Sequence, residues 1–410
     1  MYVTTYAYLV ILGILGYVSG YKSYEGYQVL RVVPDSLNEI GILRKFILQY
    51  KLDVWKESTG LGSPTDIMIS PNDIDLIRLL EEAHLSSSIL IDDVDGLIAL
   101  SRDYARFREY SELNTSRFYN VSEIHEWLEE VAVVCGASCQ IIDIGTSYEG
   151  RPLKVIKISR DGEQRRRIWL DGGIHAREWL TPAVMTYFVD KLINEDGVDP
   201  EVTELRDAFD WYIHPVVNPD GYDYSWTTDR MWRKTRSPNP GDCVGTDPNR
   251  NFDFMWGIGS NDTCSQVYQG PSAESESEIS SYTDFMTTIG DSVDLSISYH
   301  TYGEILVLPW AYSTVEPPDI ADLERLATIC VNAVNANSTL VYEFGQITGT
   351  EGGLSMDWSK GVANIKYSYI MEMRGGGTYG FLAPPSEIVP TSLENWAGVV
   401  AMAKDLMQRK

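Results

Sequence analysis

The sequence predicts a small α+β unit followed by a larger α/β unit, in which helices flank a mixed central sheet. Three observations support this fold class. The chain has 410 residues, which is enough for one large domain and a smaller one. Residues 21–92 carry strand and helix patterns in the order βαββαβ, typical of a ferredoxin-like sandwich. From residue 120 onward, apolar strands alternate with amphipathic helices.

The elements of the first unit follow from hydrophobic periodicity. The expected strands are 27–33, 52–55, 66–69 and 88–91, and the expected helices are 36–48 and 72–85. His84 has no acidic or histidine partner in a motif, so we expect it to be a surface or core residue.

The second unit is defined by the same criteria. Its expected strands are 140–144, 153–158, 167–170, 211–217, 295–299 and 365–373, and its expected helices include 122–134, 180–193, 274–288 and 321–335. His125 lies on one of these helices and His214 in a central strand, and we expect both to be structural.

The N-terminus resembles a signal peptide. An apolar run from Ala7 to Val18 precedes the small residues Ser19 and Gly20, although a basic segment before the run is missing. Twelve residues are too few to span a bilayer. We therefore expect a secreted, extracellular protein without a membrane partner. Glycosylation acceptor motifs agree with secretion; they occur at Asn114, Asn120, Asn261 and Asn337.

Charge and cysteine content narrow the partners and the compartment. Acidic residues outnumber basic ones 59 to 33, which excludes the basic surface that nucleic-acid binding requires. Five cysteines in a secreted chain indicate disulfides with one thiol left over. Cys243 and Cys264, both in loops, form a plausible bridge, and pairing of Cys135 with Cys139 is left open. Cys330 lies in a helical run and is expected to be a buried free thiol.

One motif stands at the junction between a strand and a helix. His175 and Glu178 follow the apolar strand that ends at Leu170, where α/β sheets place their sites. Imidazole and carboxylate ligands suit Zn²⁺, whereas the alternative is an incidental polar pair at a helix start. His300, at the end of another expected strand, supplies a third ligand. Two histidines and one glutamate with an open position are a catalytic zinc pattern.

With its neighbouring blocks, this pattern resembles the zinc metallocarboxypeptidases of the pancreatic and digestive type, which are made as proenzymes. The matching blocks are 173–179, 218–222, 230–236, 243–251, 299–302, 365–374 and 379–381. The resemblance implies the zinc carboxypeptidase fold, one Zn²⁺ per chain and hydrolysis of the C-terminal peptide bond of peptides and proteins. It also implies a monomer.

The resemblance further implies a domain order. Residues 1–20 would be the signal peptide, 21–92 an inhibitory prodomain, 93–106 a connecting segment and 107–410 the catalytic domain. A trypsin-like protease would activate the chain after Arg106 or Arg108. The alternative is a solvated linker helix that is not processed.

Roles at the reacting centre follow by resemblance. His175, Glu178 and His300 would bind Zn²⁺, which polarises the scissile carbonyl and acidifies its bound water. Asp247 would orient His175, and Arg233 would stabilise the oxyanion. Glu372 would be the general base, and its position as a lone acid in an apolar strand supports this. The alternative for Glu372 is a structural salt bridge.

Substrate contacts are implied in the same way. Asn249 and Arg250 would hold the terminal carboxylate of the substrate. The upstream peptide would contact Arg177, Tyr302 and Phe381. Met356 stands where the family carries an acid in members that remove Lys or Arg, so we expect release of large apolar residues. A methionine would also pack there simply as core.

The sequence departs from the family pattern at two places. The loop 346–354 is about three residues short and lacks the tyrosine that caps the bound substrate, so we expect weaker substrate capture. Gly375 replaces an acidic residue soon after Glu372. Two alternatives remain: release of C-terminal Lys or Arg, and a peptide-binding relative with weakened or lost catalysis.

Overall fold

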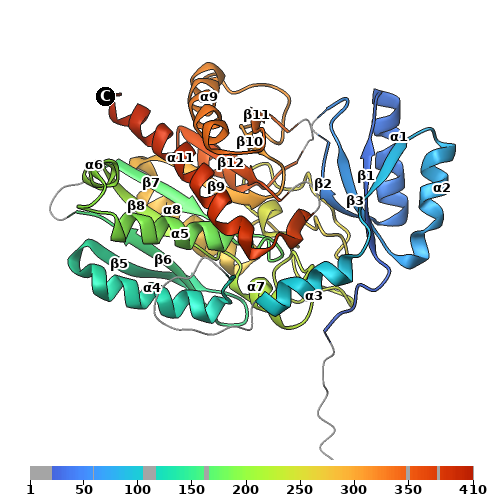
Figure 1. Cartoon of the computed structure of the whole chain (residues 1–410), viewed down its shortest axis with the longest axis horizontal. Coiled ribbons are helices and arrows are strands. Elements are labelled where there is room, and N and C mark those ends of the chain that lie inside the picture. Colours follow the sequence, from blue (N-terminus) through green and yellow to red (C-terminus); the bar gives the residue numbers. More distant parts are fainter. Residues whose placement is uncertain are drawn as a thin grey trace, which may run out of the picture.

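A computed structural model of the chain describes residues 21–58, 60–104, 117–160, 166–347, 351–375 and 379–409. A small N-terminal unit packs beside a larger one (Figure 1). The expected signal segment 1–20, Arg106, Arg108 and Asn114 lie outside the described residues. Within the described residues, no helix has the length and apolar character needed to cross a membrane.

The small unit has the predicted βαββαβ order. Its elements are β1 (Gln28–Val33), α1 (Leu37–Tyr50), β2 (Asp53–Lys56), β3 (Thr65–Ile69), α2 (Asp75–Glu82) and β4 (Ser86–Ile91). The antiparallel sheet has the order β2-β3-β1-β4. This confirms the ferredoxin-like prediction.

The two faces of this small sheet have different neighbours. Leu30 and Ile67 pack against Leu43 of α1 and Leu80 of α2. Because successive side chains of a strand point to opposite faces, Val29 and the other residues of the second face are directed away from the helices. That face packs against the larger unit, in a cluster that joins Val29, Trp55 and Ile91 to Tyr302 and Phe381.

The larger unit is organised around an eight-stranded mixed sheet of order β11-β10-β12-β9-β7-β8-β6-β5. Its strands are β5 (Cys139–Thr146), β6 (Pro152–Ile158), β7 (Arg166–Asp171), β8 (Phe209–His214), β9 (Val293–Thr301), β10 (Ile305–Val307), β11 (Glu343–Gly345) and β12 (Tyr367–Met373). Strands β8, β7, β9 and β12 are parallel neighbours in the centre.

Helices cover both faces of the central sheet (Figure 1). The helices after the small unit are α3 (Val94–Tyr104), α4 (Val121–Cys135), α5 (Leu180–Asn194), α6 (Pro200–Ala208), α7 (Pro219–Thr227), α8 (Ser277–Ile289), α9 (Ile320–Asn337), α10 (Ser355–Gly361) and α11 (Ile388–Met407). One core includes Leu170 and residues of α4, α5, α9 and α11. The other includes Trp169 and residues of α8 and α10. Adjacent residues of β7 therefore pack in the two cores on opposite faces of the sheet.

The cysteines form two disulfides among the described residues. Cys243 pairs with Cys264, and Cys135 pairs with Cys139. Cys330 is a buried free thiol on α9, as the sequence indicated.

Candidate active site

The carboxyl ends of three adjacent parallel strands bring the candidate residues together. His175 and Glu178 lie in the loop between β7 and α5, and His300 lies in the last part of β9. Glu372 of β12 is the register partner of His300. This is the sheet edge at which parallel sheets present their functional groups.

Three buried side chains converge in this place. His175 Nδ1 lies 2.8 Å from Glu178 Oε1 and 3.2 Å from His300 Nδ1. His300 Nδ1 lies 3.5 Å from Glu178 Oε2. Among the described residues, these three form the group of histidine and acidic side chains arranged to hold a metal ion.

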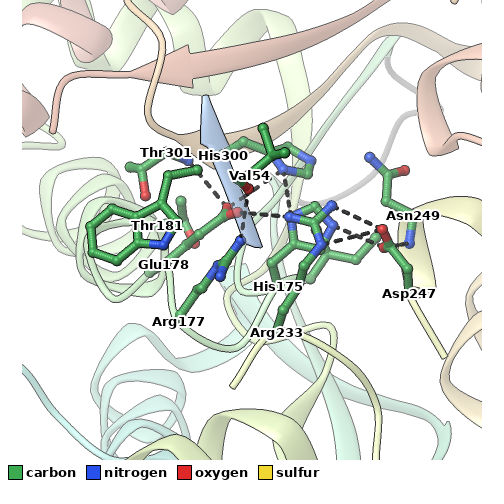
Figure 2. A network of polar contacts seen from close by, with 12 residues as sticks. Val54, His175, Arg177, Glu178, Thr181, Arg233, Asp247, Asn249, His300 and Thr301 are labelled. Carbon is green, nitrogen blue, oxygen red and sulfur yellow. Dashed lines mark hydrogen bonds and ion pairs between the residues drawn. The ribbon is translucent and has the colours of Figure 1, made fainter. Parts of the chain in front are cut away.

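Asp247 orients His175 from outside this cluster (Figure 2). His175 Nε2 lies 3.1 Å from Asp247 Oδ1. Burial disfavours a charge on Asp247, but the guanidinium groups of Arg233 and Arg250 outweigh it and hold the pKa of this carboxyl well below its usual value. Asp247 is therefore ionised and accepts the Nε2 hydrogen, which leaves a lone pair on His175 Nδ1.

A second buried carboxylate orients His300, and sequence reasoning missed it. Ser298 Oγ donates to Asp171 Oδ1 at 2.6 Å, while Tyr282 and Trp169 donate to Asp171 Oδ2 at 2.9 and 2.8 Å. Because Ser298 has only one hydrogen, it accepts one from His300 Nε2, which lies 3.3 Å away. One feature of the sequence could have identified Asp171: it is the acidic residue that ends a buried strand and begins the Asp-Gly-Gly-Ile-His motif.

These hydrogen bonds make the centre a site for a cation. Both histidine Nδ1 atoms and the carboxylate of Glu178 present lone pairs to one another, and acceptors alone cannot form hydrogen bonds. Tetrahedral Zn²⁺ with bonds of about 2.1 Å separates its ligand atoms by about 3.4 Å, close to the distances in this cluster. The donor set and its spacing therefore fit Zn²⁺.

Arg233 and Glu372 lie beside the cluster. Arg233 donates through Nε and Nη2 to Asp247 Oδ2 at 3.2 and 2.9 Å, and its Nη1 lies 3.9 Å from Glu178 Oε1. Burial raises the pKa of Glu372 to about 7, with His300 opposing that rise. A carboxyl group with such a pKa can take up and return a proton near neutral pH.

Asn249 and Arg250 lie beside Asp247: the backbone N–H of Asn249 donates to Asp247 Oδ1 at 3.0 Å, and Arg250 Nη1 lies 3.8 Å from Asp247 Oδ2. Asn249 Oδ1 accepts from the backbone N–H of Ser355 at 2.9 Å. Arg250 Nη1 donates to the carbonyl of Asn249 at 2.8 Å, and Nη2 donates to Glu351 at 2.8 Å. Glu351 was not among the predicted site residues.

The small unit covers the three residues expected to hold the upstream peptide. Asp53 accepts from Arg177 Nη1 at 3.0 and 2.7 Å, and Tyr302 donates to Asp66 at 2.9 Å. The rings of Trp55 and Phe381 lie 5.1 Å apart. The sequence analysis missed Asp53, Trp55 and Asp66. The alternation of a strand shows which side chains share a face, but it does not show which residues of the larger unit that face contacts.

A cavity of about 1150 Å³ connects these groups. His175, Glu178, His300, Arg233, Arg250 and Glu372 line it, as do Ile305, Val307, Ile347, Leu354 and Ile370. Met356 is buried behind this lining, packed with Val307, Leu354 and Ile370. The wall of the cavity on this side is therefore apolar.

The remaining histidines lie outside the cluster. His84 is exposed, and His125 lies on α4. His214 is fully buried in β8, and burial lowers the pKa of its imidazole to about 3. His214 is therefore neutral at physiological pH.

Two family models match this chain. Residues 124–398 match the family described as zinc carboxypeptidase, and residues 30–100 match the family described as carboxypeptidase activation peptide. Carboxypeptidase A1 of Mus musculus is 34% identical over 408 residues, covering 96% of this chain and 97% of that protein. Carboxypeptidase B of Astacus astacus is 37% identical over 298 residues, covering 71% and 97%.

Solved structures give the same result for the fold. The crystal structure of thrombin activatable fibrinolysis inhibitor has a TM-score of 0.84 at 33% identity, covering 93% of this chain and 99% of that one. The crystal structure of the carboxypeptidase A from Helicoverpa armigera has a TM-score of 0.87 at 25% identity, covering 94% and 98%.

Proposed function

Because this chain belongs to the zinc carboxypeptidase family and carries its activation peptide, we propose that it is a secreted zymogen. Its activated form would release single aliphatic or aromatic residues from peptide C-termini. The observation that carries this proposal is the buried His175–Glu178–His300 cluster, which opens into a cavity lined by arginines, by acidic residues and, on one side, by a wall of apolar side chains.

His175, Glu178 and His300 would hold the zinc ion, which supplies Lewis-acid activation of a carbonyl and of water. Glu372 would accept a proton from that water on its carboxylate and return it to the departing amine. Its pKa of about 7 suits both transfers. Arg233 would donate to the oxyanion that forms on the scissile carbonyl carbon, because its guanidinium lies beside Glu178.

Recognition of a chain end would rest on Arg250 and Asn249. A guanidinium group can donate two parallel hydrogen bonds to a carboxylate, and both residues line the cavity beside the zinc cluster. A free C-terminal carboxylate held there would place the last peptide bond near the metal. This geometry supports removal of single terminal residues rather than internal cleavage.

The preference for apolar residues would rest on the wall formed by Ile305, Val307, Ile347, Leu354 and Ile370, with Met356 behind it. An unpaired ammonium or guanidinium group would lose hydration against this wall. Asp357, next to Met356, is turned away, because the backbone N–H groups of Ala311 and Tyr312 donate to its carboxylate.

Zymogen behaviour would rest on the contacts of the small unit with Arg177, Tyr302 and Phe381. We propose the domain limits stated above: a signal peptide 1–20, a prodomain 21–92, a connecting segment 93–106 cut at Arg106 or Arg108 by a trypsin-like protease, and a catalytic domain 107–410. Two disulfides agree with export to an oxidising compartment. We propose that the protein acts as a monomer.

The peptide-release profile tests this function. The full chain is incubated, before and after limited tryptic treatment, with blocked dipeptides that end in Phe, Leu, Lys or Arg. We expect release of Phe and Leu only after treatment. Release of Lys and Arg alone would indicate the basic specificity instead. Absence of turnover in a treated, zinc-loaded protein would indicate a peptide-binding relative.

A further inference from the structure

We propose that Glu351 acts as an internal competitor for the substrate carboxylate at Arg250, and so sets the affinity for chain ends. This inference rests on the proposed function, because it assigns carboxylate binding to Arg250. Nothing in the sequence pattern singled out Glu351. It lies in the loop 346–354, before Met356.

The ion pair with Glu351 occupies the guanidinium group of Arg250, which the substrate carboxylate would need. Arg250 Nη1 donates to the carbonyl of Asn249, and Nη2 donates to Glu351 Oε2 at 2.8 Å. Arg250 is buried, and Glu351 retains 18% side-chain exposure within the cavity. A substrate carboxylate has the same charge as the glutamate carboxylate, so the two would compete for Arg250 Nη2 and repel each other there.

The backbone of Glu351 and of the residues that follow it makes close contacts. The N–H of Glu351 donates to the carbonyl of Ala311 at 3.1 Å. Gly353 has φ +73°, and a Cβ there would lie 2.3 Å from the carbonyl oxygen of Arg250. Residues 351–353 therefore lie close to Arg250, so a substrate would displace the side chain of Glu351 rather than its backbone.

Partial exposure limits the strength of this ion pair, since a solvated pair is worth little. A substrate can therefore displace Glu351, at the expense of affinity. The contact would also favour chain ends whose last side chain is apolar. Burial of that side chain against the apolar wall would offset the loss of the Arg250–Glu351 ion pair.

The experiment compares Glu351→Gln with Glu316→Gln, an exposed residue that carries the same charge change. Binding of 3-phenylpropanoate, which offers a carboxylate and an apolar side chain, is measured by calorimetry on the zinc-loaded, trypsin-treated protein. The neutral analogue 3-phenylpropanamide is measured alongside. The KM for the Phe-ending dipeptide provides a second measurement.

We expect Glu351→Gln to bind 3-phenylpropanoate about three- to tenfold more tightly, with KM falling by a similar factor. Binding of the amide and both measurements on Glu316→Gln should stay unchanged. Weaker binding of the carboxylate would show that Glu351 positions Arg250, and would overturn the proposal. Equal tightening for the amide, or a selective loss of Lys-ending turnover, would also overturn it.

A wild-type protein that releases no C-terminal residue refutes the proposed function by itself. Calorimetry still decides the competitor role in that case, because 3-phenylpropanoate binding does not depend on turnover.

Discussion

At the residue scale, each imidazole of the zinc cluster is oriented by a hydrogen bond from its far side. Asp247 acts directly on His175, whereas Asp171 acts on His300 through Ser298. The direct contact is charge-assisted and therefore the stronger of the two. The two histidines thus differ in how firmly the protein fixes their lone pairs.

Ser298→Ala tests the indirect contact. Without the serine hydroxyl, His300 Nε2 loses its acceptor and the ring is less well oriented, so we expect zinc affinity to fall about tenfold. Zinc release to a chromogenic chelator measures this. Ser296→Ala, on the same strand and also buried, is the control. Equal zinc affinity in both variants would show that Ser298 does not orient the ring.

Glu372→Gln tests the general base. The amide cannot take a proton from water, so we expect kcat on the Phe-ending dipeptide to fall by at least about 100-fold. Zinc content, measured by atomic absorption, should stay at one ion per chain, because Glu372 is not one of the three clustered ligands. A variant that retains most of its rate would assign the base elsewhere.

At the scale of elements, the edge strand β2 closes the site. Its residues Asp53, Trp55 and Lys56 contact Arg177, Phe381 and the carbonyl of Gly303, respectively. This four-residue strand thus contacts residues that we propose to bind the upstream peptide. Under that proposal, the small unit would inhibit by occupying these residues and would leave the His175–Glu178–His300 cluster preformed.

We predict that Glu57, just after β2, makes binding of the small unit depend on pH. The negative charge of Glu351 raises the pKa of Glu57 to about 7, with Arg250 opposing the rise. Binding is therefore fully favoured below the ordinary value of about 4.5 and is weakened as pH rises through 7. Solvent in the cavity screens the two charges, so we expect an effect of only about two- to fivefold.

The measurement is the dissociation rate of the cleaved prodomain at pH 5 and pH 8. The wild-type protein should release it faster at pH 8, and Glu57→Gln should remove most of the difference. Glu81→Gln, an exposed acid on α2, should behave as wild type. If Glu57→Gln keeps the full pH dependence, another group is responsible.

Helices and strands were predicted correctly where the hydrophobic pattern extended over enough residues to show its period. The order βαββαβ and the central strands β5–β9 and β12 follow the predicted positions within a few residues. Strands β10 and β11 were missed, since three residues each are too few to show alternation. They exist because β12 offers its free edge to β10, and β10 then pairs with β11.

At the scale of the whole molecule, the interface between the two units is centred on an aromatic side chain. Trp55 is 4% exposed and packs on Phe381, whose ring also receives the guanidinium of Arg177 at 4.2 Å. Buried tryptophans are enriched among the residues that contribute most to the binding energy of an interface. We therefore expect Trp55 to be a strong apolar contact between the two units.

Trp55→Ala should open the zymogen. Its truncation costs about 2 kcal/mol or more of interface energy, so we expect the uncut full chain to gain hydrolysis of the Phe-ending dipeptide by at least about tenfold. Leu37→Ala, exposed on α1 and outside the cavity lining, is the control. Activity equal to that of the uncut wild type would show that other contacts hold the units together.

The sequence by itself determined the fold class and indicated the three candidate zinc ligands and the candidate base, because these depend on periodicity and on residue types at fixed spacing. Only the tertiary structure decided which side chains contact and orient the residues of the site. Asp171 and Ser298 are 127 positions apart, Asp53 and Arg177 are 124 apart, and Arg250 and Glu351 are 101 apart. Such contacts depend on strand register, rotamer and the docking of one unit on another, and local sequence patterns specify none of these.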